Sequence, residues 1–338
     1  MRLGDGHAGR TLPAVDDVDT VPAPVVFCPF PPRISPHVAR LERYAVAWAT
    51  RHGFLGDQWT RAAFARARFA SLMARAYPEA DQTDLRLTVS WLTFTFMLDD
   101  HLETALGCSP QRQRELADQV VAYLVGDGPS PTALGRPLAG ALDDVWTRTR
   151  ARTGVAWRAR FVRNVAEYLA ANAWEADNRS RRRIPPVGEY LRMRRHSAAC
   201  AMFFDLVEAL AGADADTEPF TEAGLALLRL HAANVVAWFN DLVSWRKEAA
   251  DGDPHNLVLV VRHGLRLSLA DAVRHVVARH DQEVRAFLAA RDRFWPQLSA
   301  RPEIRRAVEG LECWIRANVD WSRESGRYAA PAYFDPRA

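Results

Sequence analysis

The spacing of apolar residues constrains this chain more than any other feature of its sequence. From about residue 37 onward, apolar side chains recur every three or four positions, while alternation of apolar and polar residues is nearly absent. The first pattern is typical of helices with one buried face, and the second of strands. We therefore predict an all-α fold.

Prolines and glycines divide this part of the chain into separate helices, with breakers such as Pro78, Gly212 and Pro254. The predicted helices span residues 37–52, 59–76, 82–101, 110–126, 132–151, 155–178, 187–211, 220–249, 254–263, 268–293 and 302–328. The segments 85–98 and 224–243 are apolar around most of their circumference, which predicts a central position for both.

The N-terminal segment has a different composition. Residues 1–35 are rich in Pro, Gly and Asp and have no apolar period, which predicts a tail that ends in an extended strap at Val25–Pro32. With 338 residues, of which 49% are hydrophobic, the chain can bury a core of single-domain size. We expect a flexible tail over residues 1–27 and a single domain over residues 28–334.

Charge and composition argue against several classes of protein. The net charge is only +3 and the arginines are scattered, so nucleic acid is not an expected partner; we interpret the basic run 179–183 as a solvated loop. No run approaches the roughly 20 apolar residues of a membrane-spanning helix. An acidic N-terminus without an export signal and four dispersed cysteines fit a reducing cytoplasm.

Carboxylates cluster where the first central segment ends, in FMLDDHLE. Asp99 and Glu103 are one helical turn apart and share a face, and Asp100 is turned by about 100°. Carboxylates placed against an apolar wall repel one another unless a cation or protonation relieves them, and Mg²⁺ is a suitable cation. The alternative is an acidic helix end in contact with water.

A second set of oxygen ligands lies on the other central helix, in NDLVSWRKE. Asn240, Ser244 and Glu248 are spaced four residues apart, so they form a stripe about 12 Å long that can chelate one hard cation. Beside them is Lys247, the only lysine of the chain and a suitable phosphate contact. The alternative is ordinary hydrogen bonding between helices.

These motifs resemble those of bacterial class I terpene synthases. Asp99, Asp100 and Glu103 match the aspartate-rich motif of that family, and Asn240, Ser244 and Glu248 match its downstream metal triad. Arg194, which lies 46 residues before Asn240, matches the diphosphate-sensing arginine, and Arg327–Tyr328 match the C-terminal Arg-Tyr pair. The resemblance covers about residues 28–334.

The resemblance implies a single helical bundle around a deep apolar cavity and a cyclase that releases pyrophosphate from a linear prenyl diphosphate, with farnesyl diphosphate as the default. It also implies three Mg²⁺ ions, two held by Asp99 and one by Asn240, Ser244 and Glu248, with Asp100 and Glu103 beside the ligands. The diphosphate would be contacted by Arg194, Lys247, Arg327 and Tyr328. Ser197 and Ala198 take the linker and effector positions, where the family often has glycine at the second.

Aromatic rings can stabilise a desolvated carbocation by about 2 kcal/mol or more. The best candidates are Phe96, one turn before Asp99, and Trp321, six residues before Arg327. Four further aromatic residues are more simply explained by core packing: Trp91, Trp174, Phe239 and Trp314.

Two other functions are open to a chain with this fold. A chain-elongating prenyltransferase would need a second aspartate-rich motif where NDLVSWRKE stands, and a non-catalytic prenyl-lipid carrier would not need ionic residues around a metal site. The length of the substrate depends on the side chains that floor the cavity, so the sequence leaves it open. We expect a cytoplasmic monomer or homodimer that binds a small prenyl diphosphate.

Overall fold

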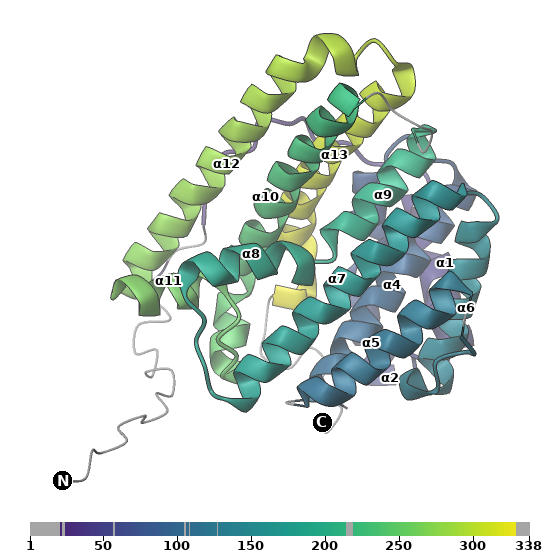
Figure 1. Ribbon diagram of the computed structural model, residues 1–338, viewed down its shortest axis with the longest axis horizontal. Helices are drawn as coiled ribbons and strands as arrows, with labels where there is room; N and C mark the ends of the chain where they lie inside the picture. The colour runs from purple at the N-terminus through teal and green to yellow at the C-terminus, as the bar shows by residue number, and fades with distance from the viewer. Residues whose placement is uncertain are drawn as a thin grey trace.

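A computed structural model describes residues 21, 24–56, 58–104, 106–107, 109–126, 128–213 and 219–328, and the regular structure in these ranges is entirely helical (Figure 1). The all-α prediction is therefore confirmed. No helix in these ranges is long and apolar enough to cross a bilayer. In chain order the elements are α1 (Val38–Arg51), α2 (Gln58–Ala67), α3 (Phe69–Ala76), α4 (Gln82–Thr104), α5 (Pro110–Val125), η2 (Thr132–Leu134), α6 (Gly135–Arg150), α7 (Val155–Ser180), α8 (Val187–Ser197), α9 (Cys200–Ala211), α10 (Pro219–Asp251), α11 (Leu257–Leu265), α12 (Leu269–Leu298), α13 (Pro302–Glu324) and η3 (Gly326–Tyr328).

The two apolar segments lie in α4 and α10, which each pack against several other helices. α4 packs against α1, α3, α6 and α9, and α10 packs against α8, α9, α11, α12 and α13. Trp91 of α4 and Trp245 of α10 are among the largest fully buried side chains. Because both helices are covered on several sides, their polar C-terminal ends are held in place by the core.

Two helices that we predicted as continuous are broken, so these predictions were wrong. Residues 59–76 form α2 and α3, with Arg68 between them at a φ of 53°, and residues 187–211 form α8 and α9, with Ala199 between them at a φ of 56°. Neither break contains proline or glycine. At the first break the carbonyl oxygen of Ala67 accepts hydrogen bonds from Trp321 Nε1 at 2.8 Å and Ser325 Oγ at 3.1 Å. These tertiary bonds replace those that a continuous helix would make.

The C-terminal helix also differs from its prediction. α13 ends at Glu324, Ser325 is extended, and Arg327 and Tyr328 lie in the separate 3₁₀ turn η3. The break places the Arg-Tyr pair on a turn that packs against α2 and α10. The pair therefore does not continue along the axis of α13.

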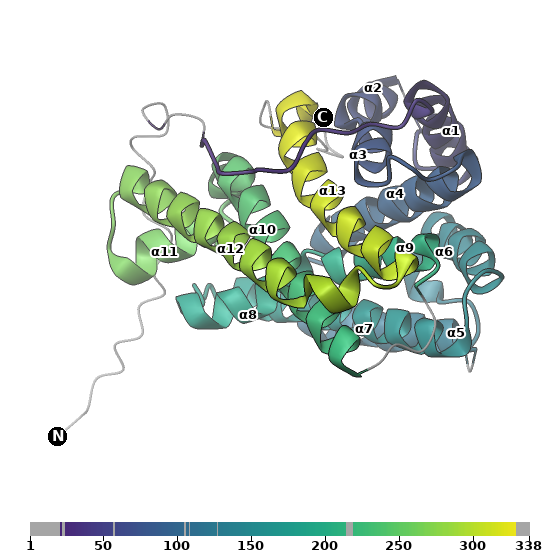
Figure 2. The same cartoon turned by 90° about the horizontal axis from the view of Figure 1, so that it is seen from above.

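The predicted strap is extended and crosses α12 and α13 (Figure 2). Phe27 N donates to Asp281 Oδ1 at 2.8 Å, and the Phe30 ring packs edge-on against Phe287 at 5.7 Å. Arg316 Nη1 donates to the carbonyl oxygen of Phe30 at 3.3 Å. Most of the tail predicted at residues 1–27, and residues 329–334 of the predicted domain, lie outside the described residues.

Candidate active site

The C-terminal end of α4 carries the aspartate-rich motif, and its first member is held from the neighbouring helix. Tyr168 of α7, which is buried, donates its hydroxyl hydrogen to Asp99 Oδ1 at 3.2 Å. Burial raises the pKa of Asp100 to about 6, although Arg327 opposes the shift. Glu103 reaches solvent, yet the surrounding protein and the charge of Asp99 raise its pKa to about 8. Negative charge is therefore unfavourable here without a further cation.

The second ligand set lies as predicted along one face of α10. Asn240 and Glu248 are half-buried, and Ser244 is buried. Burial is the main cause that raises the pKa of Glu248 to about 8, followed by the charge of Asp241. The stripe thus presents amide, hydroxyl and carboxylate oxygens in a setting that favours a bound cation over a bare carboxylate.

Arg194, near the end of α8, connects directly to this stripe. Its Nη2 donates to Asn240 Oδ1 at 2.9 Å, and its Nε donates to Asp241 Oδ1 at 2.8 Å. Asp241 is fully buried and also accepts hydrogen bonds from Tyr190 Oη and Leu257 N, each at 2.9 Å. The structure therefore brings Arg194 and the triad together.

Asp241 and Asn256 belong to this network but were not among our candidates, and the same is true of Tyr190. Asp241 could have been noticed because it directly follows Asn240 in NDLVS. Asn256 lies in the loop before α11, and its Nδ2 donates to Glu248 Oε2 at 2.6 Å. Nothing in the spacing of Asn256 marks it as a neighbour of the triad.

Lys247 relates the two motifs to each other. Its Nζ lies 3.5 Å from Asp251, one turn further along α10. Its charge also lowers the pKa of both Asp100 and Glu103, which partly offsets the effect of their burial. The charge of this lysine of α10 therefore acts on the carboxylates of α4 as well as on Asp251.

The turn η3 brings Arg327 to the same place. Its guanidinium lies over the Phe96 ring at 4.3 Å from the ring centroid, and its charge lowers the pKa of Asp100. Phe96 also stacks on Phe69 with the centroids 4.5 Å apart. Tyr328 is half-buried in the same turn.

The other candidate aromatic residues have different surroundings. Trp321 is buried beside Phe69 and Phe96, at centroid distances of 6.5 and 6.3 Å. Trp91 donates to Thr149 Oγ1 at 2.8 Å inside the core, and Trp174 donates to Glu189 Oε1 at 2.8 Å. Phe239 and Trp314 are buried as well. Only Phe96 and Trp321 lie in the cluster that Arg327 touches.

Ser197 and Ala198, the linker and effector candidates, lie at the break between α8 and α9. Ser197 Oγ is 3.4 Å from Arg194 Nη1, and Ala198 is the last residue before Ala199 turns into the left-handed region. The break is thus one turn away from the arginine of the network.

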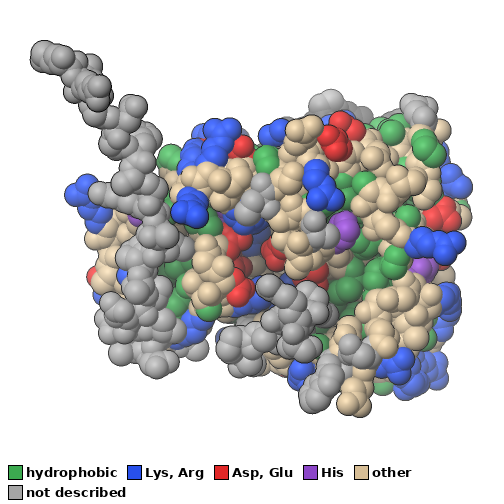
Figure 3. All heavy atoms as spheres, turned by 90° about the horizontal axis from the view of Figure 1, so that it is seen from below, with side chains coloured by type: hydrophobic (Ala, Val, Ile, Leu, Met, Phe, Trp, Pro, Cys, Tyr) green, Lys and Arg blue, Asp and Glu red, His purple; other side chains and the backbone are tan. Residues whose placement is uncertain are grey.

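The donor chemistry fits a hard divalent cation. Within the described residues, no group of three or more His, Cys, Asp and Glu side chains is arranged to hold a metal ion by itself. Two members of the triad, an amide and a hydroxyl, fall outside those residue types, and all the predicted ligands are oxygens, which Mg²⁺ prefers. Acidic side chains gather around a hollow on the face shown in Figure 3.

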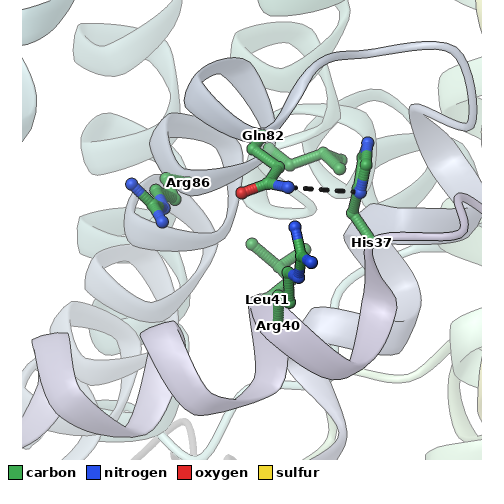
Figure 4. A pocket seen from close by; sticks show the side chains of 6 residues that line it. His37, Arg40, Leu41, Gln82 and Arg86 are labelled. Atoms are coloured by element: carbon green, nitrogen blue, oxygen red, sulfur yellow. Dashed lines mark hydrogen bonds between the residues drawn. The ribbon is translucent and has the colours of Figure 1, made fainter.

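A small pocket elsewhere does not belong to this site. It lies between α1 and α4, where Gln82 Nε2 and His37 Nδ1 are 3.4 Å apart and the exposed Arg40 and Arg86 flank the opening (Figure 4). Gln82 begins α4 and is about 25 Å along the helix from Asp99. The pocket is therefore at the opposite end of the helix.

Comparisons with known proteins agree with the helical fold and with a terpene synthase family. A family model described as terpene synthase family 2, C-terminal metal binding, matches residues 90–286. The chain is 35% identical to a (+)-T-muurolol synthase, named as cyclising (2E,6E)-farnesyl diphosphate, from Roseiflexus castenholzii, with 89% of this chain and 92% of the relative covered. It is 34% identical to a 10-epi-cubebol synthase from Sorangium cellulosum, with 90% and 98% covered. The crystal structure of germacradien-4-ol synthase from Streptomyces citricolor superposes with a TM-score of 0.76 at 27% identity, with 88% and 99% covered.

Proposed function

The chain belongs to the terpene synthase family and is a terpene cyclase, and from this membership we propose that it ionises and cyclises farnesyl diphosphate with Mg²⁺ at the site formed by α4, α8, α10 and η3. The observation that carries the proposal is that cationic side chains act on both oxygen-ligand sets: Arg194 donates to Asn240 of α10, and the charges of Lys247 and Arg327 lower the pKa of Asp100 of α4. Farnesyl diphosphate is chosen because the Roseiflexus relative is named for it.

We propose Asp99 as the ligand of two Mg²⁺ ions and Asn240, Ser244 and Glu248 as the ligands of a third. Bound Mg²⁺ would neutralise the diphosphate and make it a better leaving group. Asp100 and Glu103 add negative charge beside Asp99 without binding the metal themselves. Burial raises the pKa of both groups, and a cation on Asp99 would lower these pKa values and so favour the ionised forms.

The cationic side chains would bind and orient the diphosphate. Arg194 can give a bidentate contact, Lys247 a compact charge, and Arg327 and Tyr328 further donors from η3. Asp241 holds Arg194 through Nε, so the two Nη groups stay directed to Asn240 and Ser197. Ser197 and Ala198 would pass a movement of Arg194 to α9.

The carbocation that remains must be kept from water. We assign its stabilisation to Phe96 and Trp321, which form one aromatic cluster with Phe69. Arg327 lies over Phe96, so a shift of Arg327 toward the diphosphate would leave that ring face to the hydrocarbon. Ionisation and exposure of the aromatic ring would then be linked.

The test is incubation of the purified protein with geranyl, farnesyl and geranylgeranyl diphosphates and Mg²⁺, with analysis of products by gas chromatography and mass spectrometry. A cyclic C15 product with stoichiometric pyrophosphate supports the proposal. A longer linear diphosphate would instead show chain elongation, and binding without pyrophosphate release would show a carrier. Neither alternative agrees with the Roseiflexus relative, which is named as cyclising farnesyl diphosphate. Size-exclusion chromatography of the same sample tests the proposed monomer or homodimer, and cell fractionation the cytoplasmic location.

A further inference from the structure

Asn256 combines two roles in one buried side chain. It precedes the first turn of α11 and is fully buried, and its Oδ1 accepts a hydrogen bond from Val258 N at 2.8 Å. This is the usual geometry of an N-cap, in which the side chain satisfies a backbone donor that the helix cannot. The cap uses only the carbonyl half of the amide.

The other half of the amide faces α10. Nδ2 lies 2.6 Å from Glu248 Oε2, 2.8 Å from the carbonyl oxygen of Asp241 and 3.3 Å from Ser244 Oγ. An amide nitrogen has two hydrogens, so the two short contacts are the directed ones and the serine shares one of them. One nitrogen atom therefore touches two of the three predicted ligands on α10.

The loop that carries Asn256 is itself held firmly. Asp253 accepts hydrogen bonds from Arg179 Nη1 at 3.0 Å and from His255 N at 2.9 Å. The His255 ring lies 3.2 Å from Asn178 Nδ2, and both residues are buried. The loop is thus tied to α7 on one side and begins α11 on the other, which fixes the position of the Asn256 amide.

We propose that Asn256 is a positioning residue for metal binding: its amide holds one oxygen of Glu248 and thereby directs the other oxygen, together with Ser244, toward the cation. The inference rests on the proposed role of the α10 triad. Glu248 has three rotatable bonds before its carboxylate, and a ligand whose orientation is set in advance loses less freedom on binding. Without the amide, Glu248 would sample orientations that miss the cation, although its charge would remain.

The experiment separates the cap from the amide donor. Asn256→Ser and Asn256→Thr keep an oxygen that can cap α11, but their hydroxyls end short of the position of Nδ2 and cannot reach Glu248. The matched control is Ser268→Ala, which removes the N-cap of α12, where Ser268 Oγ accepts from Asp271 N at 3.1 Å. Both substitutions alter the N-cap of a helix, but of these two caps only Asn256 contacts the triad on α10.

The readout is the apparent dissociation constant of Mg²⁺, measured by calorimetry at a fixed concentration of pyrophosphate. We expect Asn256→Ser and Asn256→Thr to weaken Mg²⁺ binding about tenfold or more, and Ser268→Ala to leave it within twofold while lowering the melting temperature. Unchanged Mg²⁺ binding in whichever Asn256 variant folds would overturn the proposal and leave Asn256 as a cap alone.

This readout does not need turnover, so it also separates the two proposals. If the parent protein binds Mg²⁺ and pyrophosphate but converts no prenyl diphosphate, the proposed substrate fails and the role of Asn256 can still be judged. If the Asn256 variants bind Mg²⁺ normally while the parent makes a terpene, the inference fails and the proposed function stands.

Discussion

A hydrogen bond joins Arg194, which we predict to contact the diphosphate, to Asn240, which we predict to bind a metal ion. Arg194 Nη2 donates to Asn240 Oδ1 at 2.9 Å, while Nε of the same guanidinium donates to Asp241. A Mg²⁺ ion on Asn240 Oδ1 would place a second positive charge beside the arginine. This pairing becomes favourable when an anion lies between the two, because the diphosphate can attract the guanidinium and the metal at once.

The first prediction is that Mg²⁺ and pyrophosphate bind cooperatively. By linkage, pyrophosphate should raise the affinity for Mg²⁺ by the same factor as Mg²⁺ raises that for pyrophosphate. Thermal melts with each ligand alone and with both should show a combined shift well beyond the sum of the two, as expected for ligands that favour the same state. Strictly additive shifts would contradict the shared site.

The second prediction concerns the triad on α10. Asn240→Ala or Glu248→Ala should lower kcat/KM by more than about a hundredfold while the circular dichroism spectrum stays helical, because these side chains bind metal rather than fill the core. Glu309→Ala is a suitable control, since Glu309 is an exposed glutamate of α13 that lies 3.8 Å from Arg305. Retained turnover at saturating Mg²⁺ would remove both residues from the metal site.

The third prediction tests whether Lys247 faces the substrate. Lys247→Arg keeps the charge but replaces a compact ammonium by a planar guanidinium, and it should lower activity severalfold because the larger, planar group does not reproduce the geometry of an ammonium contact. Asp251→Asn removes the partner that lies 3.5 Å from Lys247 Nζ and should leave activity nearly unchanged. If the two variants have the same activity, Lys247 only forms an ion pair with Asp251 and does not contact the substrate.

The motifs were predictable because each lies on one helix with regular spacing. Asn240, Ser244 and Glu248 follow one face of α10, so their proximity depends on helix geometry alone. Asp241 and Asn256 were missed because their roles depend on neighbours from other elements. Asp241 faces Arg194 of α8, and Asn256 reaches the triad from a loop. Contacts of this kind require the tertiary structure.

The two helix breaks show the same limit. Arg68 and Ala199 are ordinary helix-forming residues, and no proline or glycine stands next to either break. At Arg68 the free carbonyl of Ala67 is satisfied by side chains of α13 and the residue that follows it. A local pattern cannot indicate a break that distant residues stabilise.

The fourth prediction uses the strain at Ala199. Its φ of 56° is a left-handed conformation that costs a residue with a Cβ atom about 1 kcal/mol or more. Ala199→Gly should therefore raise the free energy of unfolding by about 1 kcal/mol, seen as a melting temperature higher by about 2 °C. Ala209→Gly, inside α9, should lower the free energy of unfolding. If the two substitutions change the free energy of unfolding equally, the backbone conformation at Ala199 is not strained.

The last prediction concerns pH, and three carboxyl groups of the site determine its sign. Burial is the main cause that raises the pKa of Asp100 to about 6 and those of Glu103 and Glu248 to about 8, whereas in the unfolded chain all three groups ionise near pH 4. Between these values the folded protein binds more protons than the unfolded one. Its stability therefore falls as the pH rises through the folded-state pKa values.

Mg²⁺ binds the ionised carboxylate, so the stabilisation that Mg²⁺ provides should increase as the pH rises. Between pH 7 and 8.5 we expect the melting temperature to fall in EDTA, while the increment produced by Mg²⁺ and pyrophosphate grows. Glu248→Gln should make the first trend less steep, since its amide does not titrate while Glu103 still does. A Glu248→Gln variant whose stability in EDTA follows the same trend as the parent would show that Glu248 is already ionised in the fold, and the case for a cation-dependent carboxylate on α10 would fail.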